Sequence, residues 1–224
     1  VRTQHKNKKG ASKLLPLEEA RANAFKTDWA NYQPYQPQLI GVRTLNNYPL
    51  DKIVPFIDWT PFFQAWELAG RYPDILTDEV VGETARQLFQ DAQAMLKKIV
   101  EQKWLSANAV IGLFPANAVG DDIEIYTDAS RSKIAMVYHC LRQQDQKPTG
   151  KPNRCLADYI APKDTGIADT IGLFAVGAGF GIDERIKAFE AVNDDYSAIV
   201  LKALADRLAE AFAECLHKRV RDQW

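Results

Sequence analysis

Two long stretches of the chain repeat apolar residues at the three- and four-residue steps of an amphipathic α-helix, which limits the folds open to it. In the first stretch, residues 78–104, the apolar positions are Val81, Ala85, Leu88, Ala92, Met95 and Ile99. In the second, from about residue 194 to 217 or beyond, they are Tyr196, Val200, Leu204, Leu208, Ala211 and Cys215. We expect Thr77 to cap the first helix. A helix with one apolar stripe has to bury it, so both helices need packed partners.

The middle of the chain is typical of β-structure. Residues 109–114 form a short apolar run, and residues 122–127 and 133–138 are rich in strand-forming side chains. The cluster Asp-Ala-Ser-Arg-Ser at 128–132 separates the latter two and predicts a hairpin. A further apolar strand is expected at residues 169–176. Hairpins combined with long helices predict an α+β fold, in which a mainly antiparallel twisted sheet is flanked by long helices.

The composition argues against several classes of protein. The chain has 224 residues, 46% of them hydrophobic and 25% charged, with a formal net charge of −1. It lacks the basic field of a nucleic-acid-binding protein, and no apolar run approaches the ~18 residues of a membrane span. The three cysteines form no Cys-x-x-Cys pair and the three histidines are scattered. We therefore expect a cytoplasmic protein with reduced thiols, no metal site, and no nucleic-acid or membrane partner.

Residues 1–14 form a basic segment without acids. Five cations fall within it: Arg2, Lys6, Lys8, Lys9 and Lys13. With few apolar residues to pack, this segment is predicted to be an interdomain linker. Residue 1 is Val, so we expect the chain to be an excised or processed piece of a longer protein.

One carboxylate lies inside an aromatic run at residues 56–63, Phe-Ile-Asp-Trp-Thr-Pro-Phe-Phe. Asp58 is suited to cap a helix that starts at Trp59 and has Pro61 in its first turn. Alternatively, Asp58 is a buried carboxylate that holds a cationic ligand against aromatic rings. The two interpretations are compatible, and the residues alone leave both open.

Three acids recur every four residues in the second helical stretch and therefore form one row: Asp206, Glu210 and Glu214. Nearby cations are expected to relieve their repulsion: Lys202, Arg207 and Lys218. Such a row is typical of a solvated helix face, but it would also suit contact with a cation or with a histidine of a partner.

Residues 176–181, Val-Gly-Ala-Gly-Phe-Gly, follow a predicted strand and precede a helical pattern. Strand, glycine loop and helix are the elements of a nucleotide-binding unit, because glycines let the backbone approach phosphate or ribose. The acidic ribose ligand of such a unit is not evident, which favours a tight structural turn instead.

The chain, nearly throughout from about residue 15, resembles the C-terminal activation domain of cobalamin-dependent methionine synthase, and six stretches carry this resemblance. They are IDWTPFFQAWELAGRYPDIL (57–76), DEVVGETARQLFQDA (78–92), VIGLFPANAVGDDIEIY (110–126), HCLRQQ (139–144), CLADYIAPK (155–163) and DDYSAIVLKALADRLAEAFAECLHKRVR (194–221). Matches this long and numerous are far more specific than a short motif.

The resemblance implies a function in methionine biosynthesis. In this family the domain binds S-adenosylmethionine (AdoMet), which remethylates oxidised cob(II)alamin while flavodoxin or an equivalent reductase supplies an electron. Cobalamin is bound mainly by another domain of the same polypeptide, and zinc only by another domain. The whole enzyme is a methyltransferase that moves a methyl group from methyltetrahydrofolate to homocysteine.

The resemblance also assigns roles to three acids. It implies that Asp58 contacts AdoMet, that Glu210 lies near the AdoMet site, and that Asp206 approaches the cobalamin-binding domain during reactivation. No residue of this chain is expected to be a nucleophile or a general base, because cobalt and the sulfonium carry the reaction.

One departure from the family concerns its main AdoMet motif, Arg-x-x-x-Gly-Tyr, which lies beyond the last helix. The chain contains no Gly-Tyr dipeptide. We therefore expect residues 15–224 to be an AdoMet-binding activation domain that is incomplete at its C-terminus, inactive alone and weak in AdoMet binding. Two alternatives remain: a non-catalytic docking module that caps the cobalamin domain, and a free-standing AdoMet-dependent methyltransferase that uses Gly177–Gly181.

Overall fold

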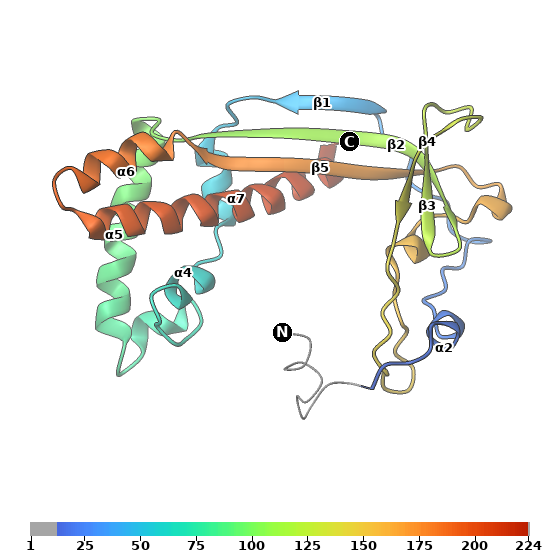
Figure 1. Ribbon diagram of the computed structural model, residues 1–224, viewed down its shortest axis with the longest axis horizontal. Helices are drawn as coiled ribbons and strands as arrows, with labels where there is room; N and C mark the ends of the chain where they lie inside the picture. The colour runs from blue at the N-terminus through green and yellow to red at the C-terminus, as the bar shows by residue number, and fades with distance from the viewer. Residues whose placement is uncertain (1–12, 224) are drawn as a thin grey trace. The chain divides into compact units, whose positions relative to one another are not determined.

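The computed structural model describes residues 13–223 and divides into two compact units (Figure 1). Unit 1 comprises residues 13–41 and 112–173, and unit 2 comprises residues 42–111 and 174–223. The elements are α2 (Leu17–Ala22), β1 (Gly41–Leu45), α3 (Leu50–Ile53), η1 (Val54–Phe56), α4 (Thr60–Gln64), η2 (Asp74–Thr77), α5 (Gly82–Glu101), β2 (Ser106–Val119), β3 (Asp122–Tyr126), β4 (Ile134–His139), η3 (Leu156–Tyr159), η4 (Lys163–Thr165), β5 (Asp169–Phe180), α6 (Ile182–Glu190) and α7 (Asp195–Gln223).

The predicted α+β fold is confirmed. Five strands form one sheet in the order β1-β2-β3-β4, with β5 also paired to β2, and the two ladders from β2 to β4 are antiparallel. Among the described residues, no helix is both long enough and apolar enough to cross a membrane. Most of the predicted linker, residues 1–12, lies outside the described residues, while Leu14 already forms an antiparallel bridge with Asp145.

The predicted hairpin of unit 1 is present as β3 and β4. Asp122 stands opposite His139, and the ladder continues to the pair Tyr126 and Ile134. The tight β2–β3 connection is made at Gly120, whose φ of +62° is accessible to glycine at little cost. β2 extends beyond the apolar run predicted at 109–114, because its length is set by pairing with neighbouring strands that local sequence does not reveal.

Unit 2 is built on the two long helices. On α7 all predicted stripe positions are buried except Tyr196, which is 45% exposed and donates a hydrogen bond to Asp91 of α5. On α5 four predicted positions are buried: Ala85, Leu88, Ala92 and Ile99. Leu96 is buried in place of its neighbour Met95, which is only partly buried. The two stripes meet in one large apolar cluster, so the helical periodicity did identify the core of this unit.

The start of α5 differs from the prediction. Thr77 does not cap it, because Thr77 ends η2 and its hydroxyl donates to the carbonyl of Asp74 at 3.0 Å. Instead, the carboxylate of Asp78 accepts the backbone N–H groups of Val80 and Val81, at 2.8 and 2.9 Å, in a separate turn. The helix therefore begins at Gly82 rather than at residue 78.

The glycine run at 176–181 is not a nucleotide loop. β5 continues through Gly177 and Gly179 to Phe180, and α6 begins at Ile182. A Cβ at Gly177 would come within 2.8 Å of the Phe180 ring, and one at Gly179 within 3.1 Å of Ala205. These glycines serve close packing inside unit 2, and the expected tight turn is limited to Gly181, which has a φ of +95° between β5 and α6. A run that is mostly strand removes the basis for a methyltransferase built on this loop.

A buried ion cluster ties the loops of unit 1 together. The guanidinium of Arg142 donates to Asp121 and Asp158, each at 2.7 Å, and the Arg142 side chain is only 4% exposed. Asp121 also accepts a hydrogen bond from Arg21 at 2.9 Å, and the Arg142 group further donates to the carbonyl of Asn153. Because every charge in the cluster has a partner, its burial does not leave an unpaired ion.

Candidate functional site

The Asp58 side chain is exposed, although the residues on either side of it are buried. Ile57 and Trp59 are each 8% exposed and point into the core, whereas Asp58 between them is exposed. The expectation of a buried carboxylate is therefore wrong.

Asp58 also acts at the start of a helix, though not at the predicted residue. Its Oδ1 accepts the backbone N–H of Thr60 at 2.9 Å. α4 begins at Thr60 rather than at Trp59, with Pro61 in its first turn. Asp58 therefore does accept a backbone N–H at the start of a helix, as the cap interpretation predicted. The helix itself begins one residue later than predicted.

The aromatic rings of this run do not surround an open site. Trp59 packs edge-on against Phe62 and Phe89, with ring centroids 5.4 and 4.9 Å apart. Phe62 and Phe63 are 1% and 0% exposed. A cation next to Asp58 would therefore not lie against these buried rings. The prediction that aromatic rings of this run hold a cation is wrong for Trp59, Phe62 and Phe63.

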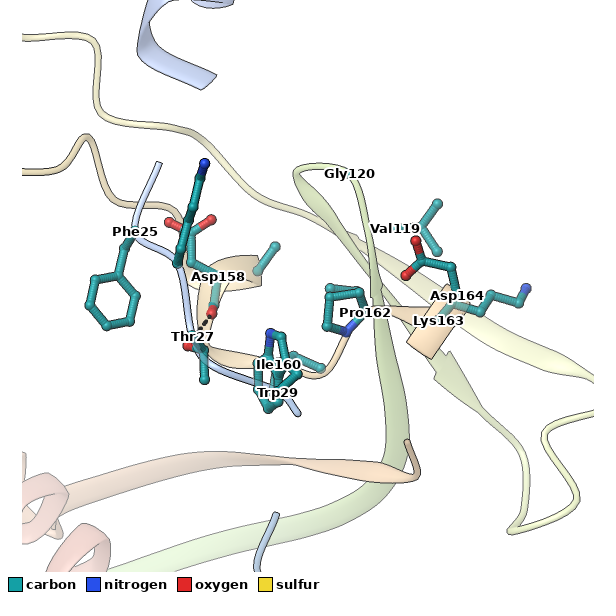
Figure 2. Close-up of a pocket in the computed structure, with 13 residues that line it drawn as sticks. Phe25, Thr27, Trp29, Val119, Gly120, Asp158, Ile160, Pro162, Lys163 and Asp164 are labelled. Atoms are coloured by element: carbon teal, nitrogen blue, oxygen red, sulfur yellow. Dashed lines mark hydrogen bonds between the residues drawn. The ribbon is translucent and has the colours of Figure 1, made fainter. Parts of the chain in front are cut away.

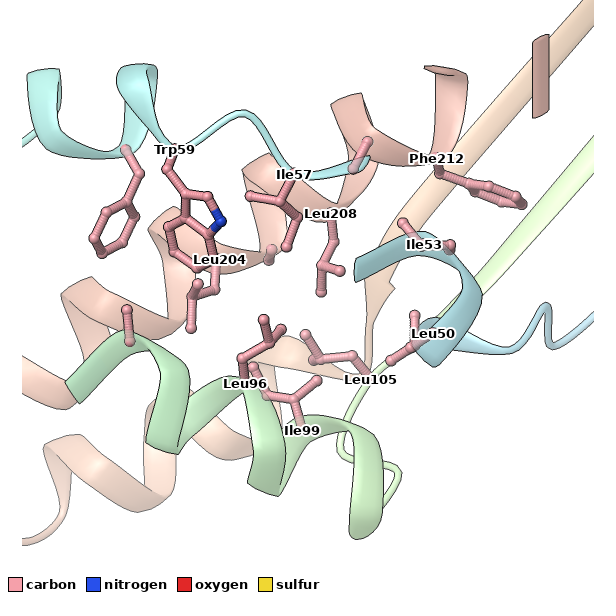
Figure 3. Close-up of a cluster of buried hydrophobic side chains, with 14 of the residues drawn as sticks. Leu50, Ile53, Ile57, Trp59, Leu96, Ile99, Leu105, Leu204, Leu208 and Phe212 are labelled. Carbon is pink, nitrogen blue, oxygen red and sulfur yellow. The ribbon is translucent and has the colours of Figure 1, made fainter. Parts of the chain in front are cut away.

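The Asp58 loop is anchored on the part of α7 that carries the other two predicted acids. η1 and α4, which flank Asp58, both contact α7. Figure 3 shows Ile57 and Trp59 directed into the same apolar cluster as Leu204 and Leu208 of α7. These two leucines lie on the buried side of the helical turns whose outer side carries Asp206 and Glu210. All three predicted site residues consequently belong to unit 2, and the segments that carry them pack on the same apolar cluster.

The acidic row of Asp206, Glu210 and Glu214 is exposed to solvent, and Arg207 forms ion pairs with the first two of these acids. The side chains of Asp206 and Glu210 are 73% and 53% exposed, whereas that of Arg207 is 13% exposed. Arg207 donates to Asp206 at 2.6 Å and to Glu210. Burial alone would lower the pKa of Arg207, but the two carboxylates raise it above its ordinary value, so the group stays charged.

The sequence did not indicate that one cation would engage both acids. Lys218, expected to relieve the same row, instead pairs with Asp222 at 2.6 Å. A cation that approaches Glu210 from solvent therefore competes with Arg207 for its carboxylate, while Asp58 carries no ion pair among the described residues. Within residues 13–223 no group of three His, Cys, Asp or Glu side chains is arranged to hold a metal ion.

A separate hollow of about 740 Å³ lies in unit 1 and contains none of the predicted site residues (Figure 2). Phe25, Trp29 and Ile160 give it apolar walls, and Lys163 lies at one side of it. The Lys163 ammonium is already paired with Glu124 at 2.7 Å. We assign this hollow no role in the site, because none of the predicted site residues lines it.

Two comparisons place the chain among known proteins. A family profile described as the activation domain of vitamin B12 dependent methionine synthase matches residues 49–224. A solved structure, the crystal structure of the MetH reactivation domain bound to AdoHcy, is 53% identical and superposes with a TM-score of 0.85. The match covers 94% of this chain and 64% of that structure, so the chain spans less than two thirds of its relative. The chain belongs to the family of activation domains of vitamin B12 dependent methionine synthase.

Proposed function

We propose that this chain binds AdoMet for the reductive remethylation of cob(II)alamin in a methionine synthase, a methyltransferase of methionine biosynthesis. The observation that carries the proposal is the exposed carboxylate of Asp58. Its segment packs on the same apolar cluster as the part of α7 that carries Asp206 and Glu210. The related reactivation domain was solved with AdoHcy, the product form of AdoMet, which supports a ligand of this chemical class.

The residues suit a ligand with a fixed positive charge. AdoMet, when bound, supplies a methyl group from a sulfonium cation, and a carboxylate about 4–6 Å from a cation stabilises it by about 3 kcal/mol at an effective dielectric of 20. Because Asp58 and Glu210 are both exposed, water screens them and the gain falls toward about 1 kcal/mol. Asp58 would bind and orient the ligand without exchanging a proton, and its hydrogen bond with Thr60 holds the carboxylate in place.

Asp206 has a different place in the proposal. Its side chain is 73% exposed and lies one helical turn from Glu210, on the outer side of α7. It would face the cobalamin-binding domain of the same polypeptide during reactivation. Cobalamin itself would be held mainly by that domain, zinc by another domain, and the electron would come from flavodoxin or an equivalent reductase in the cytoplasm. Residues 15–224 would belong to the activation domain.

The proposed function predicts a selective defect for Asp206→Asn in the full-length enzyme. The rate at which cob(II)alamin returns to methylcobalamin, with AdoMet and a reductase present, should fall about two- to fivefold, the range of an exposed charge contact. Turnover with methyltetrahydrofolate in the already reduced enzyme should not change. The measurement is the visible absorption of the cofactor over time.

Glu214→Gln is the matched control, because Glu214 belongs to the same exposed row and has no assigned contact. It should leave both rates unchanged. If the return of cob(II)alamin proceeds equally fast without AdoMet, the domain is a docking module and the proposed function is wrong. If both Asp206→Asn and Glu214→Gln leave the AdoMet-dependent rate unaltered, the assignment of Asp206 is wrong while the function stands.

A further inference from the structure

Two of the three cysteines lie together in unit 1, although 15 positions separate them. Cys155 is 3% exposed within an apolar cluster, and Cys140 packs against the same cluster. The chain brings them together because the segment after β4 runs beside the segment before η3, where the N–H of Gln143 donates to the carbonyl of Arg154 at 2.9 Å. Neither cysteine has a place in the proposed AdoMet site.

Both cysteines are fixed against the same tight turn between β2 and β3. The thiol of Cys155 donates to the carbonyl of Asp121 at 3.5 Å, and the backbone N–H of Cys140 donates to the carboxylate of Asp122 at 3.4 Å. The thiol of Cys140 donates to the carbonyl of Tyr138 at 3.6 Å, and both cysteine side chains pack in the same apolar cluster. Joining the two sulfurs therefore requires the Cys140 side chain to rotate away from this carbonyl.

The two thiols differ in their access to solvent. Cys140 is half-buried and lines a hollow of about 500 Å³, together with Leu17 and Leu141. Cys155 does not line this hollow and is 3% exposed. A small oxidant in the hollow would consequently meet Cys140 first, and Cys155 would react as the second thiol.

We propose that Cys140 and Cys155 form an oxidation site that closes to a disulfide on reaction with hydrogen peroxide. The Cys140 thiolate attacks one peroxide oxygen, the O–O bond breaks, and the departing hydroxide takes up a proton to become water. The Cys155 thiolate then attacks the sulfur of the Cys140 sulfenic acid; the S–S bond forms and the S–O bond breaks with loss of a second water. Two thiols are oxidised by two electrons and one peroxide is reduced to two waters.

The surroundings of Cys140 make this site slow at neutral pH. Burial and the neighbouring Cys155 thiol raise the pKa of Cys140 to about 11. The charged groups near it are Asp122 on β3 and, in the lining of the hollow, Arg21, Asp121 and Arg142, whose charges are paired with one another. Since the thiolate is the nucleophile, the rate of disulfide formation should rise about tenfold per pH unit between pH 7 and 10.

The test is peroxide treatment of the reduced 224-residue chain, followed by alkylation of free thiols in denaturant and peptide mass mapping. We expect linked peptides that contain Cys140 and Cys155, with the loss of two hydrogen atoms. Cys215 is the internal control, because it is buried in unit 2 and its thiol donates to the carbonyl of Lys52 at 3.4 Å. It should remain free and become alkylated.

Cys155→Ser separates the two chemical steps. In this variant Cys140 should stop at the sulfenic acid and become labelled by dimedone, whereas the wild-type chain should show little labelling. Linked peptides that involve Cys215 as often as Cys140, or oxidation of Cys140 to sulfinic acid without any link, would overturn the proposal. If Cys155→Ser does not fold, the pH series on the wild-type chain still decides, since a rate independent of pH contradicts attack by a Cys140 thiolate.

Discussion

Replacing Arg142 with Met should lower the free energy of unfolding of the 224-residue chain by about 3–5 kcal/mol, the cost of breaking a buried ion pair from one side. The change keeps an unbranched apolar stem but leaves the carboxylates of Asp158 and Asp121, which are 6% and 14% exposed, without their main partner. Asp121 would retain only its hydrogen bond from Arg21. Equilibrium unfolding in urea measures the difference.

The matched control is Arg154→Met, the same substitution at an exposed position 12 residues further along the same segment of unit 1. Arg154 stands over the ring of Phe25 at 6.0 Å, and its loss should cost less than about 1 kcal/mol. If Arg142→Met and Arg154→Met are equally mild, the Arg142 cluster does not stabilise unit 1.

The Arg142 cluster also predicts how the stability of the chain changes at low pH. Burial raises the pKa of Asp121, but hydrogen bonds from Arg21 and Arg142 outweigh this effect and hold its pKa below the ordinary value. A depressed native pKa contributes stability that is fully present above the unfolded value near 4 and is lost as the pH falls through the native value. The destabilisation by Arg142→Met should therefore be full at pH 7 and shrink below pH 4.

Phe212→Ala should lower the free energy of unfolding by about 3–5 kcal/mol, the usual cost of removing a buried phenylalanine ring. Phe212 is 0% exposed and belongs to the cluster that α7 forms in unit 2 (Figure 3). Its ring centroid lies 4.9 Å from that of Tyr48, so the substitution also removes an aromatic contact. Unfolding followed by circular dichroism and by tryptophan fluorescence measures the loss.

Ile199→Ala on the same helix is the control, because Ile199 is 51% exposed. It should change the free energy of unfolding by less than about 0.5 kcal/mol. Phe212→Leu, which retains part of the buried volume, should fall between the two. A loss below 1 kcal/mol for Phe212→Ala would show that this end of α7 is not part of the core.

The sequence predicted the long helices of unit 2 well, because a buried stripe imposes its period over many turns. Val200, Leu204 and Leu208 were identified this way and are all 0% exposed. The hairpin of β3 and β4 was equally predictable, since two strand-like runs flank a cluster of turn residues. Helix ends were less predictable: Asp78 rather than Thr77 accepts the free N–H groups before α5, and both residue types suit that role.

The candidate site was only partly predictable. Motif resemblance selected Asp58, but its aromatic neighbours suggested burial, whereas Asp58 is exposed between the buried Ile57 and Trp59. Arg207 was recognised as one of several nearby cations, and its contact with both Asp206 and Glu210 depends on side-chain conformations on α7. The Arg142 cluster joins residues 16 and 21 positions away, which no local pattern encodes.

The most direct test of the account is the affinity of the full-length enzyme for AdoMet and for AdoHcy, measured by calorimetry in wild-type and Asp58→Asn proteins. AdoHcy lacks the sulfonium charge, so a carboxylate that faces this charge distinguishes the two ligands. We expect Asp58→Asn to weaken AdoMet binding by about 1–3 kcal/mol and AdoHcy binding by clearly less, with an unchanged melting temperature, since Asn also accepts the Thr60 N–H. Unchanged affinity for AdoMet together with a lower melting temperature would contradict the account and leave Asp58 only its place at the start of α4.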